Sequence, residues 1–131
     1  MTLDADSRCP CGTGDSYGAC CGRFHAGAAA PTAEALMRSR YSAFAAASEP
    51  GMREYLLETW HPSTRPIALK LDATTHWRRL DVVRVEAGGP FDDRGIVEFA
   101  AHYADDDGRG VMRETSRFVR EGGRWFYVEA L

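Results

Sequence analysis

The sequence predicts an α+β protein in which helices precede an antiparallel sheet of about four strands, with a small cysteine-rich segment in front. Three observations support this fold class. Residues 32–60 place apolar side chains at helical spacing, and from residue 77 onward the period falls toward two. Residues 1–27, in contrast, are rich in Cys and Gly and contain few aliphatic side chains, so they cannot form a core of their own.

The composition of the 131-residue chain allows one hydrophobic core, because 44% of its residues are hydrophobic and 27% are charged. We expect a small segment over residues 1–27 and one α+β domain over residues 28–131. A formal net charge of -3 excludes a global positive field that would attract nucleic acid or anionic lipid. The first six residues carry two acids and no apolar run, which predicts neither a secretory signal nor a membrane span. We therefore expect a cytoplasmic protein.

Two helices are predicted before the sheet. Thr32 can cap the first, which runs to about Ser48, because a threonine hydroxyl accepts a hydrogen bond from the free amides of a first turn. Ser48 can cap the second, which ends where His61 precedes Pro62. A third, short helix is predicted over residues 66–71, where Ala and Leu favour that conformation.

The strands are predicted from four runs with alternating apolar side chains, over residues 77–87, 95–104, 111–120 and 124–130. Turn residues separate them, at Gly88-Gly89-Pro90, Asp106-Asp107-Gly108 and Gly122-Gly123. With two-residue turns at Asp107-Gly108 and Gly122-Gly123, the expected pairs are Tyr103 with Met112, Ala101 with Glu114, Phe118 with Tyr127 and Arg120 with Trp125. One sheet face then collects apolar residues around two polar ones, namely Val97, Phe99, Ala101, Tyr103, Met112, Phe118, Trp125 and Tyr127, with Glu114 and Ser116 among them.

The four cysteines form a C-x-C-x8-C-C pattern, at Cys9, Cys11, Cys20 and Cys21. Four thiolates at this spacing can close a tetrahedral site, for which zinc is the expected metal and iron the main competitor. Glycines beside the ligands allow the backbone to fold tightly around an ion. Since all four positions are taken by sulfur, the site is expected to be structural and not catalytic.

Two alternatives stay open at this site. His25 could replace Cys21 as the fourth ligand if the adjacent pair cannot both reach the ion. The cysteines could instead be buried free thiols or a redox pair, although Cys20 and Cys21 are poorly placed to bridge each other. A reducing compartment favours the metal site, because cysteines there are ligands more often than disulfides.

The segment from Cys9 to Gly22 resembles the SEC-C zinc motif found at the C-terminus of the SecA translocation ATPase and in several small bacterial proteins. Other segments resemble the YchJ-like family, namely Arg38-Ser39-Arg40-Tyr41-Ser42-Ala43-Phe44, Thr59-Trp60-His61-Pro62-Ser63, Glu114-Thr115-Ser116-Arg117-Phe118 and Trp125-Phe126-Tyr127. This resemblance implies a nuclear transport factor 2-like, or cystatin-like, cone in which helices pack into the concave face of a curved antiparallel sheet.

The same resemblance implies a protein partner, with the ribosome or the translocation machinery as candidates by analogy to SecA. The loop between the ligands is Asp15-Ser16-Tyr17-Gly18-Ala19, which has an acid and no base and makes contact with ribosomal RNA less expected.

Folds of this kind often enclose a cavity, and its expected lining is Tyr41, Trp60, His61, Trp77, Glu114, Ser116, Trp125 and Tyr127. In a functional interpretation Glu114 and His61 form an acid/base pair. In the alternative, which we favour, Glu114 pairs with Arg38 or Arg40 and locks the first helix against the sheet.

The sequence thus predicts a zinc-binding, non-enzymatic protein whose knuckle, residues 1–27, presents a protein-interaction surface. The alternative function is small-molecule binding or an enzymatic activity in the cavity around Glu114 and His61. The outer sheet face around Phe126 and Val128 could be covered by the knuckle or by a second chain. A third possibility is a purely structural subunit of a larger assembly, which would require a partner chain to bury this face.

Overall fold

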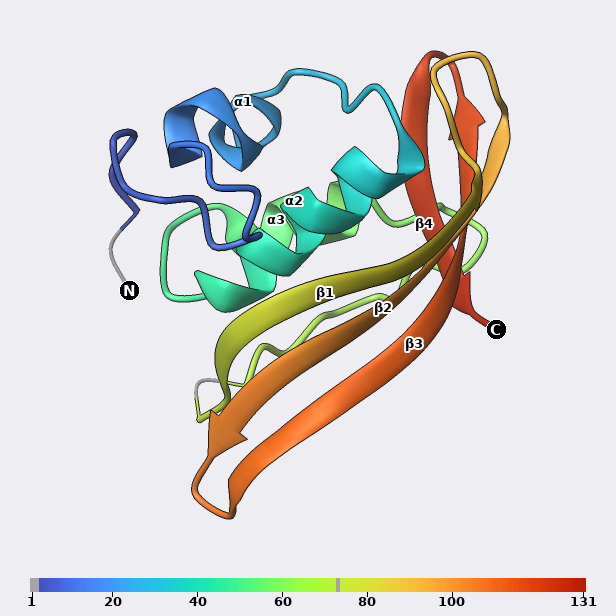
Figure 1. Cartoon of the computed structure of the whole chain (residues 1–131). Coiled ribbons are helices and arrows are strands. Elements are labelled where there is room, and N and C mark those ends of the chain that lie inside the picture. Colours follow the sequence, from blue (N-terminus) through green and yellow to red (C-terminus); the bar gives the residue numbers. More distant parts are fainter. Residues whose placement is uncertain (1–2, 73) are drawn as a thin grey trace.

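The computed structural model describes residues 3–72 and 74–131 and shows an α+β fold (Figure 1). A short 3-10 turn and three helices come first, η1 (Tyr17–Ala19), α1 (Cys21–His25), α2 (Ala33–Ala45) and α3 (Met52–Glu58). The strands follow, β1 (His76–Ala87), β2 (Arg94–Asp105), β3 (Gly108–Glu121) and β4 (Arg124–Ala130). The predicted order of helices and then strands is confirmed.

The four strands form one antiparallel sheet in the order β1-β2-β3-β4, which bends around the helices (Figure 1). Helix α2 lies on the concave side, where it contacts β1, β2 and β4. The knuckle also packs against α2, through the contacts that α1 makes with that helix. Helix α2 therefore connects the cysteine-rich segment to the sheet.

The first predicted helix cap is confirmed and the second is wrong. The Thr32 hydroxyl oxygen accepts a hydrogen bond from the Ala35 amide at 3.0 Å and so begins α2. Helix α3 is capped by Gly51, not by Ser48, and begins at Met52. Gly51 has φ 87, a left-handed conformation that glycine adopts without steric cost and that turns the chain into the helix.

The helix predicted over residues 66–71 is absent from the described chain, which has no helix between α3 and β1. Leu69 and Leu71 pack beside Leu56 and Ala43, while Lys70 between them is exposed. Burial at every second position requires an extended chain, so tertiary packing overrides the weak helical preference of Ala and Leu.

The last hairpin has the predicted register, with Phe118 opposite Tyr127 and Arg120 opposite Trp125. In the preceding hairpin the prediction is wrong by two residues, since Tyr103 faces Gly110, Ala101 faces Met112 and Phe99 faces Glu114. The turn consists of Asp106 and Asp107, so that Asp105 pairs with Gly108. A shift of two residues keeps every side chain on its predicted face.

Just after α3, Trp60 forms a short parallel bridge with Tyr127 at the free edge of β4, and a turn follows at residues 62–64. The His61 amide donates to the Tyr127 carbonyl at 2.8 Å, and the Tyr127 amide donates to the Thr59 carbonyl at 2.8 Å. The ring of His61 meets Phe126 edge-on at 5.8 Å. The predicted cover for this part of the outer face was the knuckle or a second chain, whereas a segment of the same chain lies there.

Candidate functional site

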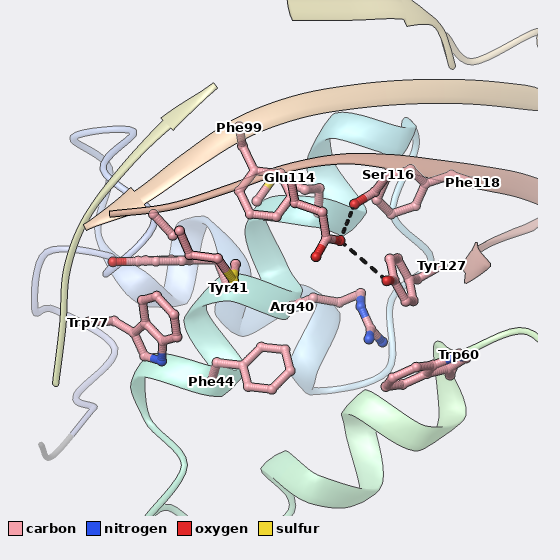
Figure 2. Close-up of a pocket in the computed structure, with 13 residues that line it drawn as sticks. Arg40, Tyr41, Phe44, Trp60, Trp77, Phe99, Glu114, Ser116, Phe118 and Tyr127 are labelled. Atoms are coloured by element: carbon pink, nitrogen blue, oxygen red, sulfur yellow. Dashed lines mark hydrogen bonds between the residues drawn. The ribbon is translucent and has the colours of Figure 1, made fainter. Parts of the chain in front are cut away.

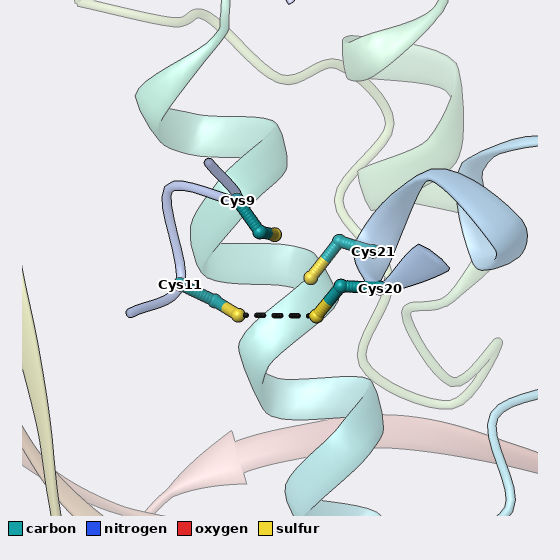
Figure 3. A group of neighbouring side chains, drawn as sticks. All are labelled: Cys9, Cys11, Cys20 and Cys21. Carbon is teal, nitrogen blue, oxygen red and sulfur yellow. Dashed lines mark hydrogen bonds between the residues drawn. The ribbon is translucent and has the colours of Figure 1, made fainter. Parts of the chain in front are cut away.

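The four cysteine side chains converge between the N-terminal loop and the start of α1 (Figure 3). Cys9 and Cys11 lie on the loop before η1, Cys20 precedes α1 and Cys21 is its first residue. Their sulfur atoms all lie within 4.8 Å of one another, and the Cys11 and Cys20 sulfurs are 3.5 Å apart. All four are buried free cysteines. The cysteine pattern thus forms one compact cluster of sulfur atoms.

Tight turns bring the ligand loop around the cluster. Gly12 and Gly14 have φ values of 84° and 92°, which side chains other than glycine adopt only with strain. Gly22 follows Cys21 at a close approach, because a Cβ there would lie 2.7 Å from the Tyr17 carbonyl oxygen. The predicted role of the glycines beside the cysteines agrees with this geometry.

The cluster has the dimensions of a four-sulfur metal site. Zinc to sulfur bonds of about 2.3 Å place the corners of a tetrahedron about 3.8 Å apart. The observed sulfur separations, from 3.5 Å up to at most 4.8 Å, bracket that value. Small shifts of the side chains would close the tetrahedron, so the cluster is compatible with a metal site.

The four thiols influence one another's ionisation. Hydrogen bonds from Cys11 and Cys21 hold the pKa of the Cys9 thiol well below its usual range. Hydrogen bonds with Cys11 and Cys9, together with burial, raise the pKa of Cys21. One thiolate is therefore stabilised at the expense of its neighbours, and four buried thiolates require a cation among them.

His25 lies outside the sulfur cluster. Its Nε2 donates to the Ser39 carbonyl oxygen at 2.9 Å, so its Nδ1 is the acceptor for the Tyr17 hydroxyl at 2.6 Å. Burial lowers the pKa of His25, which agrees with a neutral ring. The structure places this side chain as a link between α1 and α2, and not as the alternative fourth ligand.

Helix α2 also holds the knuckle through Arg38 and Ser42. Arg38 donates to the Cys11 carbonyl oxygen at 2.9 Å and to the Glu34 carboxylate at 3.0 Å. The Ser42 hydroxyl lies 3.7 Å from the Cys9 sulfur. Arg38 therefore faces the knuckle, and it is not the predicted partner of Glu114.

A second feature is a cavity of about 250 Å³ between α2, the segment after α3 and the concave sheet face (Figure 2). It is lined by Met37, Arg40, Tyr41, Phe44, Trp60, Trp77, Phe99, Ala101, Met112, Glu114, Ser116, Phe118 and Tyr127. Of the predicted lining residues, six are present and two, Trp125 and His61, are not. The Trp125 Nε1 donates to the carbonyl oxygen of Pro31 at 3.3 Å, and Pro31 lies just before the first residue of α2.

His61 lies away from the cavity because it directly follows Trp60 in an extended segment. Neighbouring side chains in such a segment point to opposite faces, so Trp60 lines the cavity while His61 meets Phe126 and the Glu121 carboxylate, at 2.9 Å. The Glu114 carboxylate accepts from the hydroxyls of Ser116 and Tyr127. The structure therefore does not bring Glu114 and His61 together as an acid/base pair.

Arg40 is the cavity residue that the sequence interpretation placed in a different role. Its Nη1 donates to the Leu56 carbonyl oxygen at 2.7 Å and to the Thr59 hydroxyl at 2.6 Å. Within the described residues, no ion pair shorter than 4.0 Å joins it to Glu114. One feature of the sequence could have identified Arg40 as a cavity residue. It lies three residues after Met37 and four before Phe44, so it shares the apolar face of α2 with them.

Within residues 3–72 and 74–131, none of the helices has the length and apolar character needed to cross a membrane.

Comparison with known proteins places the chain in a family. A family model described as "YchJ, middle NTF2-like domain" matches residues 32–130. A UPF0225 protein of Corynebacterium efficiens is 53% identical over 131 residues, covering 97% of this chain and 95% of that protein. A UPF0225 protein of Chromobacterium violaceum is 52% identical over 132 residues, covering 97% of this chain and 94% of that protein.

Two solved structures share the fold. The solution structure of a SEC-C motif containing protein from Rhodopseudomonas palustris matches with a TM-score of 0.78 and 31% identity, covering 95% of this chain and 97% of that one. The crystal structure of a SEC-C motif containing protein from Psychrobacter arcticus matches with a TM-score of 0.78 and 28% identity, covering 98% and 84%. The chain therefore belongs to the YchJ-like family of UPF0225 proteins, with a nuclear transport factor 2-like domain behind a cysteine cluster.

Proposed function

We propose that Cys9, Cys11, Cys20 and Cys21 hold one zinc ion in a structural site, and that the knuckle ordered by this ion is a protein-interaction surface. The observation that carries the proposal is the convergence of four buried sulfurs in a segment with few aliphatic side chains. A structural zinc site contributes about 10–16 kcal/mol of apparent binding free energy, which can replace a missing hydrophobic core. The solved neighbours are named for the same SEC-C motif.

Zinc is the preferred metal because the site is closed and made only of sulfur. Four thiolates fill a tetrahedron and leave no position for a water molecule, as in structural zinc sites. Iron is the main competitor, since it also accepts tetrahedral thiolate ligands. The two metals differ in spectrum, because an iron-thiolate site absorbs visible light and a zinc site does not.

Metal analysis tests this assignment. We expect the protein, purified under reducing conditions, to contain close to one zinc ion per chain by inductively coupled plasma mass spectrometry. Replacement by cobalt(II) is expected to give the charge-transfer and ligand-field bands of a tetrahedral thiolate site. A visible spectrum with stoichiometric iron would reassign the metal, and a content far below one ion per chain would contradict the proposal.

The interaction surface that we propose lies on the exposed turns of the knuckle, residues 12–15 and 18–19. These turns have small residues and one acid, Asp15, whose carboxylate makes no hydrogen bond or ion pair within the described residues. The surface is thus uncharged apart from Asp15, which favours a protein partner over the phosphate backbone of a nucleic acid. The backbone of these turns lies between Cys11 and Cys21, so the shape of the surface depends on the metal that we propose these cysteines hold.

A charge reversal at Asp15 tests the interaction surface without touching the ligands. We expect Asp15→Lys to keep its metal and to lose the proteins that the wild type captures from a native lysate. The matched control is Asp106→Lys, an exposed turn residue at the far end of the sheet (Figure 1), which is expected to capture the same proteins as the wild type. Equal capture by both variants would contradict a role of the knuckle surface.

A further inference from the structure

The cavity contains a buried cation whose hydrogen-bonding capacity is only partly used. Arg40 is 6% exposed and lines the cavity. Its Nη1 makes both of its hydrogen bonds, to Leu56 and Thr59, whereas Nε and Nη2 make none within the described residues. Burial lowers the pKa of Arg40 to about 10, so that the guanidinium is still charged at neutral pH. The nearby Glu114 charge partly opposes this shift, but no ion pair within 4.0 Å joins the two groups in the described residues. Nε and Nη2 therefore keep donors for an anion in the cavity.

The guanidinium is held in a fixed position. It lies over the rings of Trp60 and Tyr127, with its Cζ 5.2 Å and 4.7 Å from their centroids. The two bonds of Nη1 hold it from the side of α3. A guanidinium fixed in this way presents its remaining donors in one plane, which matches the two oxygens of a carboxylate.

Two further polar groups in the cavity wall lack partners. Both hydroxyls that donate to Glu114, those of Ser116 and Tyr127, bind its Oε2, and within the described residues Oε1 accepts no hydrogen bond (Figure 2). The Trp60 indole Nε1 is fully buried and also has no partner there. The cavity therefore offers donors at Arg40 and an acceptor at Glu114.

The other walls are apolar and mainly aromatic, including Tyr41, Phe44, Trp77 and Phe99 (Figure 2). Such walls suit a ligand with a flat, apolar ring. The volume of about 250 Å³ lies below the range of about 300–1,000 Å³ that is typical for drug-sized ligands. A molecule with one small ring system fits these dimensions.

We propose that the cavity binds a small aromatic carboxylate, with its carboxylate on Arg40, its ring between the aromatic walls and a hydroxyl or N–H donor on Glu114. A single negative charge matches the single guanidinium. Any anion in this cavity also faces the Glu114 carboxylate, and a phosphate with two charges is repelled more strongly than a carboxylate with one, which favours the carboxylate. The proposal is independent of the metal site, because none of the four cysteines lines the cavity.

Binding of matched acids and amides tests the proposal. The probes are phenylacetate, 4-hydroxyphenylacetate and indole-3-acetate, each beside its neutral amide, followed by saturation-transfer NMR and by the fluorescence of Trp60 and Trp77 in the cavity wall. We expect each acid to bind at least about tenfold more tightly than its amide, which corresponds to about 1.4 kcal/mol. We expect 4-hydroxyphenylacetate to bind more tightly than phenylacetate, because only the former carries a donor for Glu114.

Three variants locate the binding. Arg40→Gln is expected to abolish the preference for acid over amide, and Glu114→Gln to reduce the preference for the hydroxylated acid. Ala101 is 1% exposed and lines the cavity, so Ala101→Leu reduces the cavity volume without removing a charge. This variant is expected to weaken the binding of acids and of amides to the same extent. Unchanged metal content and cooperative thermal unfolding show that each variant is folded.

Two results would overturn the proposal. One is equal binding, or no binding, of acids and amides by the wild-type protein. The other is a preference for acids that persists in Arg40→Gln, or an affinity for acids that Ala101→Leu leaves unchanged, since the anion would then bind elsewhere. Neither result would affect the proposed zinc site.

Discussion

Replacing Cys11 with serine is expected to release the metal and to loosen the knuckle while the sheet stays folded. Cys11 is 0% exposed, and its sulfur lies 3.5 Å from that of Cys20. A serine hydroxyl stays protonated at neutral pH and is a poor zinc ligand, so much of the binding free energy of about 10–16 kcal/mol is lost. The sheet has its own ladder of hydrogen bonds, so we expect it to stay folded without the ion.

Two measurements check this expectation. Metal content should fall from about one ion per chain to well below one, and amide hydrogen exchange should accelerate at least about tenfold over residues 3–27 but not over β2 and β3. The matched control is His25→Ala, which removes a nitrogen ligand candidate that the structure places on Ser39 and Tyr17. It should keep the metal and lose only about 1–3 kcal/mol of stability. Full metal content in Cys11→Ser would contradict the site.

Truncation of Phe118 to alanine is expected to remove a large part of the stability of the cone. Phe118 is 1% exposed on β3, and its ring packs edge-on against Tyr127 with the centroids 5.8 Å apart. A buried Phe→Ala change costs about 3–5 kcal/mol, against a total of about 5–15 kcal/mol for a domain. Phe118 also lines the cavity described above, so its truncation enlarges an existing cavity.

Urea and thermal unfolding of the metal-loaded protein measure the effect. We expect Tm to fall by on the order of 10 °C. Phe91→Ala is the matched control, because Phe91 is 96% exposed in the β1-β2 turn and its truncation should change stability by less than about 0.5 kcal/mol. A similar loss in both variants would show that Phe118 is not part of the packed core.

Strand and helix positions were largely predictable because each is encoded locally. Alternating apolar residues marked all four strands, and Thr32 marked the start of α2. The errors came where competing local signals were nearly equal in free energy. Ser48 and Gly51 are both acceptable caps, and the Asp106-Asp107-Gly108 turn can close at either of two positions.

The two candidate sites differed in how much of them the sequence contained. The cysteine cluster was predictable because all four cysteines lie within thirteen consecutive residues, and a short loop brings them together by itself. The cavity combines residues from α2, β1, β2, β3, β4 and the segment after α3. The acid/base pair of Glu114 and His61, which was the less favoured interpretation, does not form, because Trp60 takes the inward position and places His61 on the opposite side.

The sequence alone determined the fold class, the order of the elements, the face of each strand and the cysteine cluster. These features follow from periodicity and from ligand spacing, which are properties of short segments. The tertiary structure decided the register of one hairpin, the packing of His25 onto α2 and the partners of Arg40 and Glu114. Such contacts join residues that are far apart in the chain. They depend on how the helices pack on the concave face of the sheet, and not on the preference of any single segment.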